Sequence, residues 1–64
     1  MYKLKVEGYN GKKFFKLFNR QYKKYPAKKF NELLEMYENN TNNFKTIQIM
    51  LFKNGELIAK ERIF

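Results

Sequence analysis

The side chains that most enzymes use for chemistry are nearly absent from this 64-residue chain. There is no His, Cys, Ser or Asp, so neither a Ser–His nor a Cys–His pair can form. The two hydroxyl side chains, Thr41 and Thr46, have no histidine to activate them. Glu32, Glu35 and Glu38 recur at helical spacing, but they alternate with apolar residues as on an ordinary exposed helix face. The sequence therefore predicts a protein that is not an enzyme and that uses no metal and no cofactor.

Positive charge dominates the chain, with 14 basic residues against 6 acidic ones and a net charge of +8. Residues 12–29 hold eight of these bases and no acid. A block of like charge repels itself and is typical of a surface that binds a polyanion. We therefore expect this segment to contact nucleic-acid phosphates, although a solvated basic face kept for solubility is the alternative interpretation. The eight bases are Lys12, Lys13, Lys16, Arg20, Lys23, Lys24, Lys28 and Lys29.

Aromatic residues are interleaved with these bases, and they suggest how a nucleic acid would be held. Rings that stack on bases, next to cations that follow the phosphates, are typical of single-strand binding. Core packing is the competing interpretation for each ring. The candidates for stacking are Phe14, Phe18, Tyr22 and Tyr25. Base-specific contacts rely strongly on arginine, and the chain has only Arg20 and Arg62, so we expect little sequence specificity for either DNA or RNA.

Two Asn-Gly pairs predict the turns that position these residues, because both residue types accept the positive φ of a type I′ hairpin turn. The pair Asn54-Gly55 would join a strand within 44–53 to a strand within 56–64. It would pair Phe52 with Leu57, Leu51 with Ile58, and Gln48 with Glu61.

The pair Asn10-Gly11 predicts a first hairpin that pairs Val6 with Phe15 and Leu4 with Leu17 on one face. The opposite face would then carry Lys3, Lys5, Phe14, Lys16 and Phe18. The apolar spacing within 12–25 also fits a helix, so this segment has two interpretations.

A helix is predicted between the two hairpins. Pro26 suits its first position, and Asn39-Asn40 would end it. Its apolar stripe consists of Ala27, Phe30, Leu33, Leu34 and Tyr37. The prediction for residues 1–64 is thus a single α+β domain of order ββαββ, with one helix packed on an antiparallel sheet, or βααββ if 12–25 is helical.

Docking on a larger protein is the alternative function. In size and composition alone, the chain resembles small phage and mobile-element proteins, some of which inhibit host or defence proteins, as anti-CRISPR inhibitors do. The basic segment could dock on an acidic or nucleic-acid-binding protein, and a sheet edge within 44–53 or 56–64 could add a strand to it. A third option is a small phosphate-bearing ligand held by the lysines.

Composition, the longest apolar run and the chain length bear on the source, the location and the oligomeric state of the protein. Lys, Asn, Phe and Tyr, which have A/T-rich codons, make up half of the chain, so an A/T-rich genome, such as that of a low-GC bacterium or its phage, would give this composition without selection for function. The longest apolar run, Ile49-Met50-Leu51-Phe52, is far shorter than the ~20 residues that span a bilayer, so we expect a cytoplasmic protein without membrane contact. A homodimer would help to stabilise so short a chain.

Overall fold

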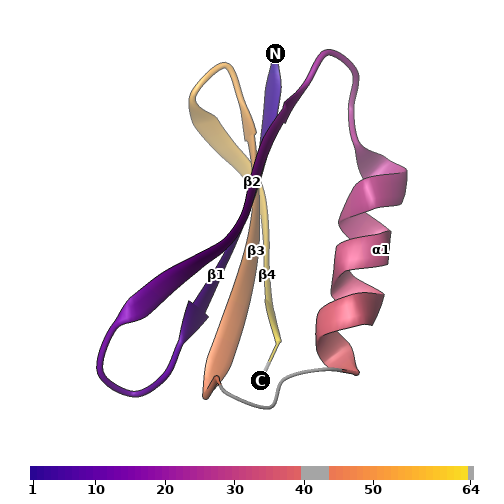
Figure 1. The fold of residues 1–64 in the computed structure, drawn as a ribbon. Helices are drawn as coiled ribbons and strands as arrows, with labels where there is room; N and C mark the ends of the chain where they lie inside the picture. The colour runs from indigo at the N-terminus through magenta and orange to yellow at the C-terminus, as the bar shows by residue number, and fades with distance from the viewer. Residues whose placement is uncertain (40–43, 64) are drawn as a thin grey trace.

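The computed structural model describes residues 1–39 and 44–63, which form four strands and one helix in the order ββαββ. The elements are β1 (Tyr2–Tyr9), β2 (Phe14–Tyr22), α1 (Ala27–Glu38), β3 (Thr46–Lys53) and β4 (Glu56–Ile63). The strands make one antiparallel sheet in the order β2-β1-β3-β4, and α1 runs along one side of it (Figure 1). The predicted α+β fold is confirmed. The βααββ alternative is excluded, since residues 14–22 form a strand that pairs with β1.

The core lies between α1 and the two central strands. Every second side chain of a strand points to the same face of the sheet, and in β1 and β3 these alternate positions are apolar. Burying each such side chain contributes about 1.5–3 kcal/mol. The buried core residues are Leu4, Val6, Leu33, Ile47, Ile49, Leu51 and Ile63. Alternation in β1 and β3 is thus what holds the sheet against the helix.

The β1–β2 turn is wider than the two-residue turn predicted at Asn10-Gly11, because the connecting segment covers residues 10–13. The side-chain oxygen of Asn10 accepts hydrogen bonds from the backbone N–H groups of Lys12 and Lys13, at 2.9 and 3.0 Å. Of the Asn-Gly pair, only Gly11 has a positive φ, of 98°. An asparagine that bonds to the backbone ahead of it closes this wider loop in place of a type I′ turn.

A β-bulge in β2 corrects the predicted register of the first hairpin. The structure pairs Val6 with Phe18, Leu4 with Arg20, and Glu7 with Lys16. The predicted pairs, Val6 with Phe15 and Leu4 with Leu17, are therefore wrong, and Phe18 faces the helix rather than the opposite side. The bulge leaves Leu17 without an opposite partner, so that Leu17 and Phe18 both pack against the core. Burial of two consecutive side chains gives a physical reason for the irregularity.

The second hairpin has the predicted turn. Asn54 and Gly55 have φ values of 51° and 87°, the left-handed values that a type I′ turn requires. Phe52 pairs with Leu57 as predicted. Beyond this pair, a bulge at Ile58 shifts the register by one residue. Leu51 therefore pairs with Ala59, and Gln48 with Arg62, instead of with Ile58 and Glu61.

The apolar side of α1 largely matches the predicted stripe. Leu33 is buried, and Phe30, Leu34 and Tyr37 pack against the core, whereas Ala27 is exposed. Burial raises the pKa of the Tyr37 hydroxyl above its usual value. No helix in residues 1–39 and 44–63 is long and apolar enough to cross a membrane.

Pro26 and Asn39 are the residues that cap the two ends of α1. Pro26 was predicted to be the first residue of the helix. It is instead the N-cap residue, and the helix begins one residue later, at Ala27. Asn39 is the C-cap residue, and its backbone N–H and its side-chain amide both donate to the carbonyl oxygen of Glu35, at 3.3 and 3.0 Å. The other predicted stop residue, Asn40, lies outside the described residues, as does Thr41.

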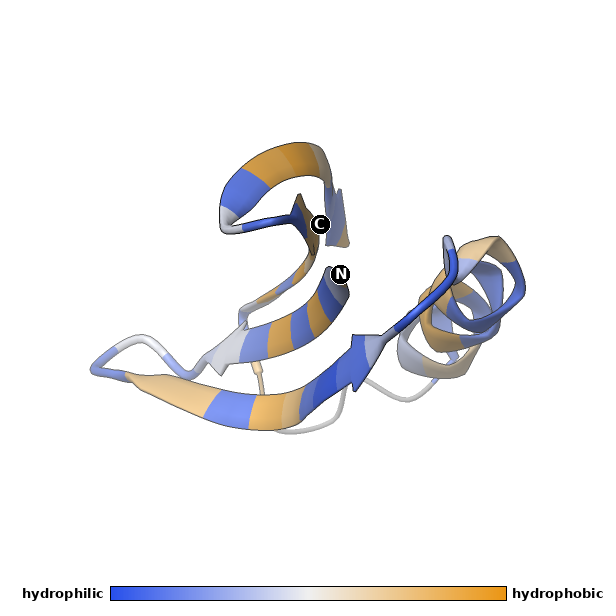
Figure 2. Cartoon of the chain, turned by 90° about the horizontal axis from the view of Figure 1, so that it is seen from above, coloured by the Kyte–Doolittle hydropathy of each residue, from blue (hydrophilic) through white to orange (hydrophobic). Residues whose placement is uncertain are grey.

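The sheet has one face under α1, the inner face, and one face turned away from it, which we call the open face. The β3–β4 hairpin bends away from the helix (Figures 1 and 2). β2 and β4 are the edge strands, and both contain a bulge. β3 pairs with a strand on each side, so the predicted free edge within 44–53 is wrong.

Candidate nucleic-acid interface

The eight bases of residues 12–29 do not share one surface. Lys12 and Lys13 lie in the β1–β2 turn, at the opposite end of β2 from the segment that leads into α1 (Figure 1). Nine residues of strand separate the two places, which corresponds to roughly 25–30 Å. Lys16 lies on the open face, since it pairs with Glu7, and Arg20 lies on the inner face, since it pairs with the buried Leu4.

The other four bases come together where β2 leads into α1, and we call Lys23, Lys24, Lys28 and Lys29 the junction cluster. They line a shallow depression of about 560 Å³. The remaining lining residues are Tyr22, Tyr25, Pro26 and Glu32. Six of the twelve candidate residues identified from the sequence therefore surround one depression.

Charge in the junction cluster is only partly neutralised. Lys29 forms an ion pair with Glu32, with 3.6 Å between Nζ and the carboxylate oxygen. The same ammonium lies 5.6 Å from the centre of the Phe18 ring. Lys23, Lys24 and Lys28 are exposed, and in the part of the chain that the structure describes they form no salt bridge. These lysines are therefore the ones free to meet an anionic ligand.

The four candidate stacking rings divide into two pairs. Phe14 and Tyr25 are 57% and 56% exposed, so both are accessible from solvent. Phe18 and Tyr22 are half-buried and pack against the core. The Tyr25 ring meets the ring of Tyr2 edge-on, with 5.5 Å between centroids.

In residues 1–39 and 44–63, no group of three or more potential ligands could hold a metal ion. Glu32, Glu35 and Glu38 are exposed on α1. The hydroxyl of Thr46 is buried and has no hydrogen-bond partner among the residues that the structure describes.

The open face carries basic residues that the sequence analysis did not select. The register places five bases and one acid there: Lys3 and Lys5 from β1, Lys16 from β2, Lys60 and Arg62 from β4, and the acid Glu7 from β1. Of these, only Lys16 belongs to residues 12–29. The strand period had already placed Lys3 and Lys5 on one face with Lys16, although not as binding residues. The same spacing of two between Lys60 and Arg62 is the signal that could have added β4.

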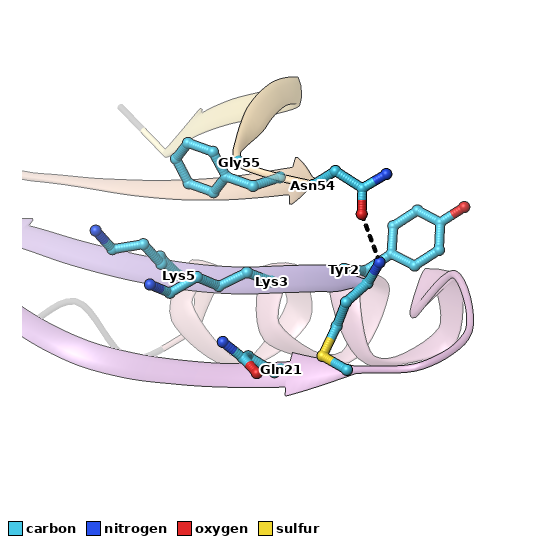
Figure 3. A pocket seen from close by; sticks show the side chains of 8 residues that line it. Tyr2, Lys3, Lys5, Gln21, Asn54 and Gly55 are labelled. Carbon is cyan, nitrogen blue, oxygen red and sulfur yellow. Dashed lines mark hydrogen bonds between the residues drawn. The ribbon is translucent and has the colours of Figure 1, made fainter.

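A hollow of about 410 Å³ lies at the end of the open face nearest the β3–β4 turn. Lys3 and Lys5 extend into this region from β1, and Gln21 from the neighbouring β2 (Figure 3). Its other lining residues are Met1, Tyr2, Phe52, Asn54 and Gly55. The N-terminal ammonium donates a hydrogen bond of 2.7 Å to the side-chain oxygen of Asn54, which ties β1 to this turn (Figure 3).

Comparison with protein-family models, with curated proteins and with solved structures finds no match to this chain.

Proposed function

We propose that this chain is a non-enzymatic protein that binds nucleic acid with little sequence specificity. The observation that carries the proposal is the junction cluster, where exposed lysines without an acidic partner surround a depression next to an accessible tyrosine ring. Lysine ammonium groups contact phosphates as point charges and read no base identity. Arg20 and Arg62, the residues best suited to reading guanine, lie on opposite edge strands.

The start of α1 adds to the positive potential of the junction cluster. There is no acidic residue in the first turn of the helix and no side-chain cap on its N-terminus. The first backbone N–H groups of a helix carry partial positive charge. Their field adds to that of Lys28 and Lys29, so the depression favours an anion such as a phosphate.

Salt-dependent binding of a labelled oligonucleotide tests the proposal. Each lysine–phosphate contact contributes about 0.7–0.9 to the slope of log affinity against log salt concentration. The triple variant Lys23→Gln/Lys24→Gln/Lys28→Gln should therefore lower this slope by about 2 to 3. If the wild-type protein fails to bind any DNA or RNA at ~50 mM salt, the proposed function is wrong.

A matched control removes the same charge from the other end of the molecule. Lys12, Lys13 and Lys45 are exposed, and Lys45 lies beside Gly11 of the β1–β2 turn. The variant Lys12→Gln/Lys13→Gln/Lys45→Gln should lose less affinity than the junction variant. Equal losses would mean that net charge, rather than the junction cluster, determines binding.

Direct docking on a larger protein is the second candidate function, favoured by two exposed aliphatic residues. Leu57 and Ile58, at the start of β4, are 46% and 45% exposed and adjacent. Exposed apolar residues of this kind are common in protein interfaces. Capture of one defined protein from nuclease-treated lysate, lost in Leu57→Ser/Ile58→Ser, would support docking over nucleic-acid binding.

A further inference from the structure

The open face is the second strongly basic surface of this molecule, and its charge is segregated from the acids. Its single acid, Glu7, stands among five bases. The helical acids lie on α1, on the other side of the sheet, and Glu61 pairs with the buried Ile49 of the inner face. A net positive charge spread over three strands of one sheet face matches a polyanion that lies across several strands.

Aromatic and apolar atoms lie between these cations. Phe52 pairs with Lys3 on one side and with Leu57 on the other, and the Lys5 ammonium is 5.8 Å from the Phe52 ring centre. Further along the face, Tyr9 packs against the exposed Phe14, with 4.8 Å between ring centroids. A duplex presents phosphates and hides its base faces, whereas a single strand offers both phosphates and bases. The alternation of rings and cations therefore fits a single strand.

The open face and the junction cluster are linked around the end of the sheet through Tyr2. Tyr2 lines the open-face hollow, but its ring lies on the inner side, where it packs against the core and contacts Tyr25, which lines the junction depression. Both sites lie at the same end of the molecule (Figure 1). The molecule is 32 Å long in its longest dimension, so one strand of at least about four nucleotides could follow this path.

We propose that single-stranded nucleic acid binds across the open face, with a base stacked on Phe52 and phosphates held by Lys3, Lys60 and Arg62, before it passes over Tyr2 and Tyr25 to the junction cluster. This inference rests on the proposed function and specifies which form of nucleic acid is bound and where. Lys3 and Lys5 are half-buried, and a lysine in such a position can bury its aliphatic stem while its ammonium group stays in contact with solvent.

Titration of the ¹⁵N-labelled protein with oligothymidylate of about eight nucleotides, followed by NMR, tests the path. Amide shifts should change along β1 and β3 and around Tyr25, and little around Lys12 and Lys13. At the same salt concentration, the single strand should bind about tenfold more tightly than a duplex of equal length. Equal affinity for the duplex would overturn the single-strand assignment.

Variants of the open face separate this inference from the proposed function. Lys3→Gln/Lys60→Gln/Arg62→Gln should weaken binding more than the matched turn variant Lys12→Gln/Lys13→Gln/Lys45→Gln. Phe52→Leu, which keeps an apolar side chain but removes the flat ring, should lose about tenfold, and Phe52→Tyr should keep the affinity.

The outcomes distinguish the two ideas. No binding of any nucleic acid by the wild type overturns both. Binding that is weakened by the junction variant but not by the open-face variant, with no shifts on β1 and β3, overturns only the open-face site. An acidic peptide that shifts the same amides and outcompetes oligothymidylate would identify a protein as the occupant.

Discussion

At Gly8, β1 lies close against the Phe44 ring of the segment before β3. A Cβ atom built on Gly8 would lie 2.6 Å from Cδ1 of the Phe44 ring, well inside van der Waals contact. The Phe44 ring packs against the core and meets Phe15 edge-on, with 6.0 Å between centroids. Glycine is required here by the close approach of the ring.

We therefore expect Gly8→Ala to destabilise the protein by about 1–3 kcal/mol. This corresponds to a fall in Tm of roughly 4–8 °C per kcal/mol, measurable by thermal denaturation. In the double variant Gly8→Ala/Phe44→Leu, the smaller leucine relieves the clash, so the loss should be less than the sum of the two single losses. If Gly8→Ala had the same Tm as the wild type, the Phe44 ring would not pack against Gly8 as described.

At the scale of the elements, α1 is attached to the sheet chiefly through Leu33. Leu33 is the buried residue of the helix, with 2% of its surface exposed, whereas Met36 on the same helix is 48% exposed. Removing a buried leucine side chain leaves a cavity and costs about 2–5 kcal/mol. The whole stability of a chain this short is only about 3–10 kcal/mol.

Leu33→Ala should therefore lower the Tm by about 10 °C or more, or abolish cooperative unfolding, as followed by far-ultraviolet circular dichroism. The matched variant Met36→Ala should change the Tm little, because Met36 is solvent-exposed. Equal effects of the two substitutions would mean that α1 does not pack as described.

The two Asn-Gly turns show how far the sequence predicts these elements. The helix and the second hairpin were predictable from helical spacing, strand patterns and the Asn54-Gly55 turn, whereas the spacing within 12–25 fitted both the strand that is observed and a helix. The same dipeptide nevertheless adopts a type I′ turn at Asn54-Gly55 and a wider loop at Asn10-Gly11. The local sequence does not distinguish these outcomes, because packing of Leu17 and Phe18 against the core determines the register of the first hairpin.

The candidate site was predictable only in part, for a related reason. A count of charge along the chain selected the eight bases of 12–29, but it did not show that only the four of the junction cluster lie together. The open face joins residues from both ends of the chain, such as Lys5 and Lys60, which both pair with Met50 of β3. Such a surface emerges only once the strand order and both bulges are known.

At the scale of the whole molecule, repulsion between positive charges opposes folding. The net charge is +8, and in the described residues the pair of Lys29 and Glu32 is the only salt bridge. At ~0.1 M salt, charges more than about 10 Å apart are largely screened. Added salt should therefore weaken this repulsion in the folded state more than in the expanded unfolded chain.

We expect the Tm to rise by several degrees between about 20 and 500 mM NaCl, as measured by calorimetry without nucleic acid. The variant Lys12→Gln/Lys13→Gln/Lys45→Gln should show a smaller rise, because it carries less charge. A Tm that is constant or falls with salt would show that charge repulsion does not limit stability.

The pairing of β1 with β3 also constrains when the chain can fold during its synthesis. Leu4 and Val6 meet Leu51 and Ile49 across this pairing, so the first strand has no buried partner until the third has been made. The amino-terminal hairpin alone is a two-stranded ribbon without a core, which is marginal in water. Folding is therefore expected as a single late event, in which the helix and both hairpins assemble together once β3 has emerged from the ribosome.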